Sequence, residues 1–309
     1  RESLDAGNLL GPPLFASPPL WEGNRLFYSF ARTLRTPEVA DMEIAKARAM
    51  GVDYMKSYVR APIPIMNKIA QAALDIGIPT GTHMLSPGAA AGLAGTTHLS
   101  ATQRMGYGWA KSFTGLISYQ DAYDLHAKSD FHVVDTLFSS LALVGADPAL
   151  IGDDRFKLLT PPNFIDGLRN TTAPDAATMA NIRRDAEQSA KVQRAGGLLA
   201  TGTDTPLVAP GIALHTNLRA AGLASSNVQA LQDVTINAAR MSMLDKDLGT
   251  VEVGKLADLT IVRGNPLQDL KAAANVEFVV KNGVSYSVGD ILAPFRTPTA
   301  LAERKRAVV

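Results

Sequence analysis

The chain has 309 residues, of which 46% are hydrophobic and 19% charged, a composition typical of a folded globular protein with a sizeable core. The formal net charge is +1, and the charge pattern does not favour binding to nucleic acid or to a membrane surface. There is no cysteine, so a metal would have to be held by histidine, carboxylate or modified lysine.

No apolar run reaches the roughly 18 residues that a membrane span needs. Residues 1–15 lack the basic start and the apolar stretch of a signal peptide, so we expect no targeting signal in this chain and leave its compartment open.

The first predicted helix covers residues 36–51. Thr36 is a typical N-cap, Pro37 suits the first helical position, and Gly51 is a typical stop. Residues 62–77 repeat this pattern of an amphipathic body that ends on a glycine.

Short apolar segments that stop at polar residues alternate with these helices. The predicted strands are 52–59, 78–83, 94–100, 131–138 and 196–204. Strands that alternate with helices favour an α/β fold with a parallel sheet, in which functional residues gather at the carboxyl ends of the strands.

The ends of these predicted strands carry side chains that can bind a metal ion or transfer a proton. Lys56, His83, His98 and Asp204 each lie near the end of a predicted strand. Taken alone, each histidine also fits a buried structural role, and Asp204 also fits a cap of the following turn. Together they form a ligand set that suits zinc or another divalent metal.

The remaining histidines rank lower as site residues. His126 lies in a helix-like segment and is predicted to be a surface residue, and His132 opens a strand, which favours a structural role. His215 fits either the same cavity as Asp204 or a packing role in a helix.

Several segments together resemble the metal-dependent amidohydrolase superfamily, particularly its imidazolonepropionase and prolidase-like branch. They are GVDYMKSYV (51–59), IPTGTHML (78–85), GTTHLSA (95–101), LLATGTDTP (198–206) and the block that contains TINAA, LGTVEVGKLADLTIV and GNPL (228–270). The resemblance extends over roughly residues 11–289.

The resemblance implies a (β/α)8 TIM-type barrel with a metal site at its C-terminal face. Lys56 matches the lysine whose CO2-derived carbamate bridges two metals, and His83 and His98 match the ligands of the second metal. Asp204 matches the aspartate that contacts the first metal and shuttles protons. The implied activity is hydrolysis of amide, peptide or cyclic amide C–N bonds in small molecules, with metal-activated water as the nucleophile.

One departure from the family is a missing motif. The family's first strand carries a His-x-His pair, and no His-x-His occurs in this sequence. We therefore expect an incomplete barrel from the C-terminal part of a larger enzyme, in which two metals would be bound. The alternative is a non-catalytic fragment or an assembly subunit.

The expected organisation is a partial barrel over residues 1–245, a small β-sandwich segment over 246–290 and a tail over 291–309. Segments 249–262 and 276–289 alternate like hairpin strands, with Asn-Gly at 282–283 as a turn signal. An incomplete barrel exposes a strand edge before Lys56. We expect a partner copy, a separate N-terminal chain or rearranged N-terminal residues to cover that edge, and a homo-oligomer is one such solution.

Substrate contacts are predicted only weakly. Tyr58 and Arg60 follow Lys56 by two and four residues, so an extended strand would place all three on one side. Arg60 would suit a substrate carboxylate, although a surface position is an equal alternative, and Arg104 is a weaker candidate of the same kind.

Overall fold

The computed structural model describes residues 1–99, 120–205 and 207–306. Its strands are β1 (Trp21–Glu22), β2 (Arg32–Thr33), β3 (Met55–Lys56), β4 (Thr80–Gly81), β5 (Gly95–Thr97), β6 (His132–Asp135), β7 (Leu199–Thr201), β8 (Leu259–Val262), β9 (Val276–Lys281) and β10 (Val284–Ser287).

The helices of the first half are α1 (Glu2–Asp5), α2 (Pro37–Ala49), α3 (Ile63–Ile76), α4 (Leu85–Ala90) and α5 (Gln120–Lys128). Those that follow are η1 (Phe138–Ala146), α6 (Ala149–Gly152), α7 (Asp154–Leu159), α8 (Pro162–Arg169), α9 (Ala176–Arg194), α10 (Ile212–Ala221), α11 (Asn227–Asp233), α12 (Ile236–Met241), η2 (Leu270–Ala274), α13 (Val288–Leu292), η3 (Ala293–Arg296) and α14 (Pro298–Arg306). None of the helices that the structure describes is long and apolar enough to cross a membrane.

The chain divides into two compact units. The first comprises residues 1–135, 191–200 and 239–245, and the second comprises residues 136–190, 201–238 and 246–309. Each unit has its own clusters of buried apolar side chains, so each is described by itself.

Parallel strands form the centre of the first unit. β1 pairs with β2, β3 with β4, and β5 with β6, and every one of these pairs is parallel. Single bridges between Trp21 and Ser57 and between Thr82 and Thr96 connect the pairs, and β7 follows β6 in the sheet order. The predicted α/β architecture with parallel strands is confirmed.

Residues from the N-terminal part of the chain lie along the edge of β3. The backbone N–H of Tyr58 donates to the carbonyl of Trp21 at 2.8 Å. Whether a partner copy, a separate N-terminal chain or rearranged N-terminal residues cover an exposed edge of the sheet stays a prediction.

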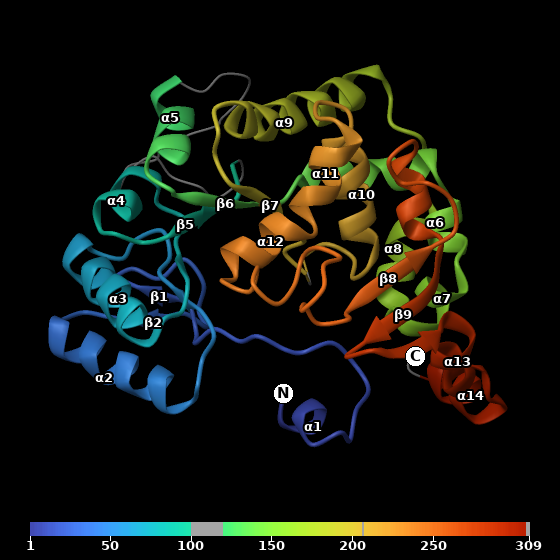
Figure 1. The fold of residues 1–309 in the computed structure, drawn as a ribbon, viewed down its shortest axis with the longest axis horizontal. Helices are drawn as coiled ribbons and strands as arrows, with labels where there is room; N and C mark the ends of the chain where they lie inside the picture. The colour runs from blue at the N-terminus through green and yellow to red at the C-terminus, as the bar shows by residue number, and fades with distance from the viewer. Residues whose placement is uncertain (100–119, 206, 307–309) are drawn as a thin grey trace. The chain divides into compact units, whose positions relative to one another are not determined.

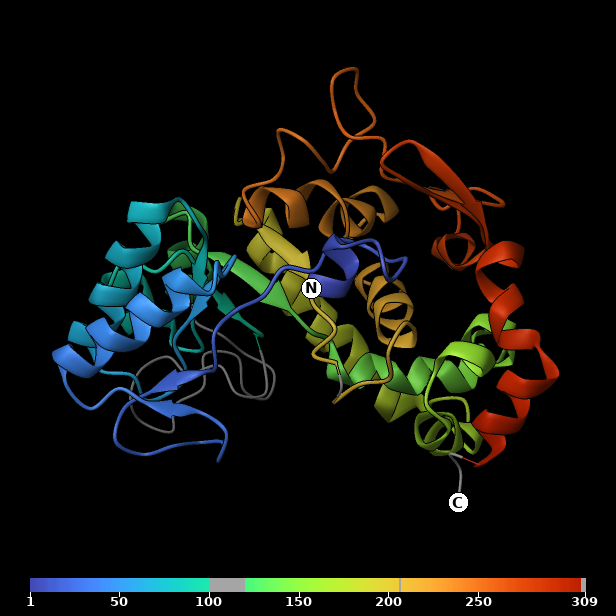
Figure 2. The same cartoon turned by 90° about the horizontal axis from the view of Figure 1, so that it is seen from below.

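Helices α2 and α3 pack side by side in the first unit (Figures 1 and 2). Thr36 caps α2 by accepting from the backbone N–H of Val39, and Gly77 ends α3 in the left-handed conformation at φ 71°. The predicted caps are therefore confirmed. Ile65, Met66 and Ile69 of α3 are buried in the core of this unit.

The second unit contains a three-stranded sheet of order β10-β9-β8, which is followed by α13, η3 and α14. β9 and β10 form an antiparallel hairpin, whose turn residues Asn282 and Gly283 have φ values of 50° and 80°. The predicted Asn-Gly turn is confirmed. The predicted strand over residues 249–262 is only partly right, because β8 begins at Leu259 and the residues before it are irregular.

Candidate functional site

The carboxyl ends of β3, β4 and β5 bring three predicted residues to one edge of the first unit's sheet. Lys56 ends β3 and pairs with Gly81, so His83 lies just beyond the end of the neighbouring strand. His98 directly follows β5. Because the strands are parallel, their ends lie at the same edge, and the structure places Lys56, His83 and His98 on adjacent strands there.

His83 and His98 form a buried pair. Their ring centroids are 5.1 Å apart with an interplanar angle of 68°, and both side chains are buried. The ring of Tyr58 lies 4.3 Å from that of His83, centroid to centroid. Tyr58 is therefore a neighbour of the pair.

Burial and a nearby cation control the protonation of His98. Loss of solvent lowers the pKa of His98 to about 4, and the positive charge of Lys56 acts in the same direction. The imidazole is therefore neutral at pH 7, which is the form that binds a metal ion.

His98 and Asp204 share an uncommon backbone conformation. Their φ values are 63° and 50°, in the left-handed region that side chains with a Cβ atom seldom occupy. Such conformations gather at functional sites, where the surrounding structure holds them. Asp204 follows β7 by three residues and is half-buried.

Sequence reasoning missed Asp135, which ends β6. Its carboxylate is buried and accepts a hydrogen bond from the backbone N–H of Leu99 at 3.0 Å. The pairing of Thr97 with Val134 places His98 and Asp135 at the same level. The signal was present, since the segment HVVD is an apolar strand that stops at an aspartate, as the strand before Asp204 does.

Glu22 at the end of β1 was also missed. The side chain is fully buried at 0% exposure, and its Oε2 accepts a hydrogen bond from the backbone N–H of Phe27. Burial raises the pKa of Glu22, while Phe27 and Arg60 act in the opposite direction. A single acidic residue before a glycine carries no sequence signal for such an environment.

The extended strand expected beyond Lys56 is shorter than predicted. β3 ends at Lys56, Ser57 makes a single bridge, and Val59 and Arg60 form a turn. The Arg60 guanidinium lies 5.6 Å from the centroid of the Phe27 ring. The roles of Tyr58 and Arg60 in substrate binding stay predictions, and Arg104 lies outside the described residues.

The prediction that His126 is a surface residue is wrong. Its side chain is 1% exposed, Nδ1 lies 2.7 Å from the carbonyl oxygen of Phe131, and the two rings stack. The helical periodicity was right, but α5 turns this position toward the core. His132, by contrast, has the structural role that was expected, because its ring is buried against Gly95.

His215 lies on α10 in the second unit, half-buried and facing a pocket there. Burial lowers the pKa of His215 to about 4, with smaller contributions from Arg219 and Arg155. Its predicted contact with the substrate stays a prediction.

The two imidazoles suit a divalent metal by their donor type and by their neutral state. Within residues 1–99, 120–205 and 207–306, no group of three or more His, Asp or Glu side chains is arranged to hold a metal ion. Among the described residues, this edge therefore offers two imidazoles, with Lys56 at the adjoining strand end.

Comparisons with known proteins concern the family and the fold. Residues 170–285 match the Amidohydrolase family. No curated protein matches the chain.

Solved structures match almost the whole chain. A Xaa-Pro dipeptidase with methionine bound in its active site has a TM-score of 0.65 at 19% identity, covering 93% of this chain and 71% of its own. Bottromycin amidohydrolase has a TM-score of 0.67 at 17% identity. The match covers 98% of this chain and 71% of the amidohydrolase. Ochratoxinase from A. niger has a TM-score of 0.62 at 14% identity. The match covers 93% of this chain and 68% of the ochratoxinase.

At these identities the structures establish the fold, which is the TIM-barrel type of the amidohydrolases. Residues 170–285 thus match the Amidohydrolase family, and the chain shares its fold with a Xaa-Pro dipeptidase and an amidohydrolase.

Proposed function

We propose that this chain contributes to a metal-dependent hydrolase that cleaves amide, peptide or cyclic amide C–N bonds in small molecules. The observation that carries the proposal is the buried pair of His83 and His98, whose ring centroids lie 5.1 Å apart at the ends of neighbouring parallel strands. The matched family and the prolidase fold support the reaction class.

His83 and His98 would hold a divalent ion, zinc being one that imidazole ligands suit. Lys56, converted by CO2 to a carbamate, would provide an anionic ligand at the adjoining strand end. Two such ions would be bound in a longer parent enzyme. A bound divalent ion supplies polarisation of the substrate carbonyl and lowers the pKa of water.

Asp204 is the proposed proton carrier. Its carboxylate would accept the proton of the attacking water and return it to the nitrogen that leaves, so that the C–N bond breaks to give a carboxylic acid and an amine. Tyr58 and Arg60 would orient the substrate, and Arg60 matches a substrate carboxylate in charge. His215 is the weakest member of the proposed substrate-binding set.

The alternative function is that of a non-catalytic fragment or an assembly subunit. The absence of His-x-His from the sequence favours it. We further propose that residues 1–245 are a partial barrel, residues 246–290 a β-sandwich segment and residues 291–309 a tail. In this proposal an N-terminal segment or a second copy completes the molecule.

Metal content tests the proposal directly. The chain is dialysed against zinc in the presence of bicarbonate, and bound zinc is measured by elemental mass spectrometry. We expect about one ion per chain, because the histidine pair and modified Lys56 together provide three ligands. His83→Ala, His98→Ala and Lys56→Ala should each lower the zinc content to less than half.

His215→Ala is the matched control, since it removes a histidine that is no part of the strand-end set, and its zinc content should equal that of the wild type. Retention of zinc by the His83 and His98 variants would overturn the proposed site. An absence of zinc in the wild type would favour the fragment alternative.

A further inference from the structure

Asp135 ends β6 next to the histidine pair, and its side chain is buried at 4% exposure. Aspartate is seldom buried to this extent unless its carboxylate has a partner. One partner is the backbone N–H of Leu99, which donates to Oδ1 of Asp135 at 3.0 Å. Leu99 directly follows His98 and is itself buried. The carboxylate therefore holds the peptide unit that joins His98 to Leu99.

The backbone of His98 needs such support. Its φ of 63° lies in the left-handed region, which is unfavourable for a residue with a Cβ atom. Two consecutive residues of β6 hold this part of the chain. The N–H of His98 donates to the carbonyl of Val134 at 2.8 Å, and the next N–H donates to the carboxylate of Asp135.

The backbone conformation of His98 also determines where its ring lies. The direction of the Cα–Cβ bond relative to the strand changes with φ, so a return to the extended conformation would turn the side chain away from its present position. In the left-handed conformation the ring centroid lies 5.1 Å from that of His83. A hydrogen bond that keeps His98 in this conformation therefore keeps the two rings together.

We propose that Asp135 is a positioning residue, whose carboxylate fixes the Leu99 peptide and thereby holds the His98 ring beside His83 in the arrangement that binds a metal ion. Asp135 acts as a hydrogen-bond acceptor through the backbone, and it is not a metal ligand. The inference rests on the proposed function for its role in the reaction, but the position of the His98 ring can be measured without metal.

Two variants separate the hydrogen-bond acceptor from the charge. Asp135→Leu has a similar shape but no acceptor, whereas Asp135→Asn keeps an acceptor oxygen and loses the charge. In the zinc-free 309-residue chain, the nuclear Overhauser effect between the ring protons of His83 and His98 should disappear in the leucine variant and persist in the asparagine variant. Its loss in both variants, or in neither, would overturn the proposal.

Zinc affinity is the second readout, measured by competition with a chromophoric chelator. Asp135→Leu should weaken zinc binding by about 10- to 100-fold, the usual effect of removing a group that orients a metal ligand. Asp135→Asn should stay within about threefold of the wild type, because a neutral oxygen still accepts the hydrogen bond. Equal losses in the two variants would contradict the proposal, since they would assign the effect to the charge.

The two proposals can fail separately. If the wild type binds no zinc but the contact between the rings responds as expected, the proposed metal site fails and the positioning role of Asp135 stands. If the wild type binds zinc and a folded Asp135→Leu variant keeps both the contact and the affinity, only the positioning role fails.

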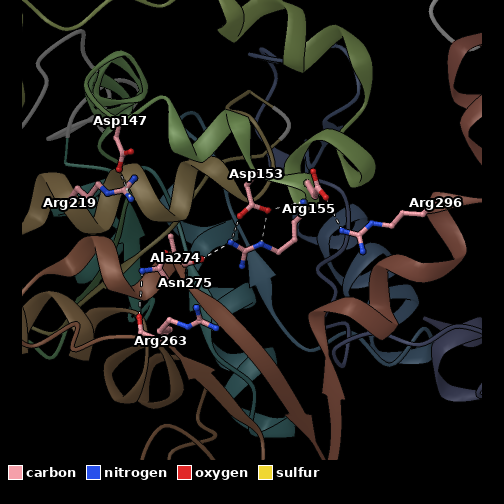
Figure 3. A network of polar contacts seen from close by, with 9 residues as sticks. Asp147, Asp153, Arg155, Arg219, Arg263, Ala274, Asn275 and Arg296 are labelled. Atoms are coloured by element: carbon pink, nitrogen blue, oxygen red, sulfur yellow. Dashed lines mark hydrogen bonds and ion pairs between the residues drawn. The ribbon is translucent and has the colours of Figure 1, made fainter.

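Two controls remove similar hydrogen bonds elsewhere. Oγ1 of Thr80 accepts from the backbone N–H of Ala94 at 2.8 Å, near the amino ends of β4 and β5. In the second unit, Oδ1 of Asp153 accepts from the backbone N–H of Arg155 at 2.8 Å (Figure 3). Thr80→Val and Asp153→Leu should lower stability against urea but leave the ring contact and the zinc affinity unchanged. Loss of the ring contact in the Thr80 variant would overturn a specific role of Asp135.

A measurement on the wild type tests the hydrogen bond even if the leucine variant does not fold. The amide proton of Leu99 should exchange slowly with solvent, because both it and its acceptor are buried. Exchange at the rate of an unprotected amide would overturn the proposal.

Discussion

Three histidines outside the strand-end pair, of which two are buried and His215 is half-buried, have lowered pKa values. Burial lowers the pKa of His126, His132 and His215 to about 4 in each case. In the unfolded chain these groups titrate near pH 6.5. Between pH 6.5 and pH 4 the unfolded state therefore binds more protons than the folded state. The free energy of unfolding that is present above pH 6.5 is lost as the pH falls toward and through 4.

His126→Asn should reduce this pH dependence. The asparagine amide can still donate to the Phe131 carbonyl, but it does not titrate. Between pH 6.5 and 4, the slope of the unfolding free energy against pH should decrease by up to about 1.4 kcal/mol per pH unit. Urea unfolding at a series of pH values measures this slope. Parallel curves for the variant and the wild type would contradict a low pKa for His126.

At the scale of single elements, the hairpin of β9 and β10 depends on its turn. Asn282 and Gly283 both have positive φ, as a two-residue turn that matches the twist of the strands requires. Glycine is suited to this conformation because it has no Cβ atom.

Gly283→Ala should destabilise the hairpin by about 1–2 kcal/mol, the cost of placing an alanine in the left-handed region. Hydrogen exchange at the amides of Val279 and Val280 should accelerate accordingly, by about 5- to 30-fold. Gly167→Ala is the control, because Gly167 is an exposed residue of α8 without a positive φ, and an added Cβ would meet open space. It should leave exchange in the hairpin unchanged, and equal acceleration in both variants would contradict a specific role of the turn.

The segment before β8 shows how an element can differ from its sequence pattern. Val251 and Val253 alternate with polar residues as in a strand, yet they are largely exposed and lie in irregular structure. A strand needs a partner for its backbone groups, and alternation does not supply one. Residues 259–262 satisfy this requirement through β9.

For the molecule as a whole, the division into two units has consequences for stability. The core cluster that contains Ile69 draws its residues from the first unit, and the cluster that contains Leu150 draws its residues from the second. Each unit can therefore lose packing without direct loss of the other's core contacts.

Ile69→Ala should lower the stability of the first unit by about 2–5 kcal/mol, because it opens a cavity at a fully buried position. Native-state hydrogen exchange should accelerate at Val133 in β6 far more than at Leu218 in α10. Ile69→Val is the control, with an expected cost of about 0.5–1.5 kcal/mol in the same unit. Equal acceleration in both units would show instead that the chain unfolds as one cooperative body.

The sequence alone determined the alternation of helices and strands, the caps at Thr36 and Gly77, the Asn-Gly turn and the placement of Lys56, His83 and His98 at strand ends. These features depend on neighbours close along the chain, which local patterns report well. Tertiary structure decided the burial of His126, the strand-end position of Asp135 beside His98 and the pocket that His215 faces. Those features arise from contacts between side chains that are distant in sequence. Periodicity along the chain carries no information about which of these side chains lie next to one another.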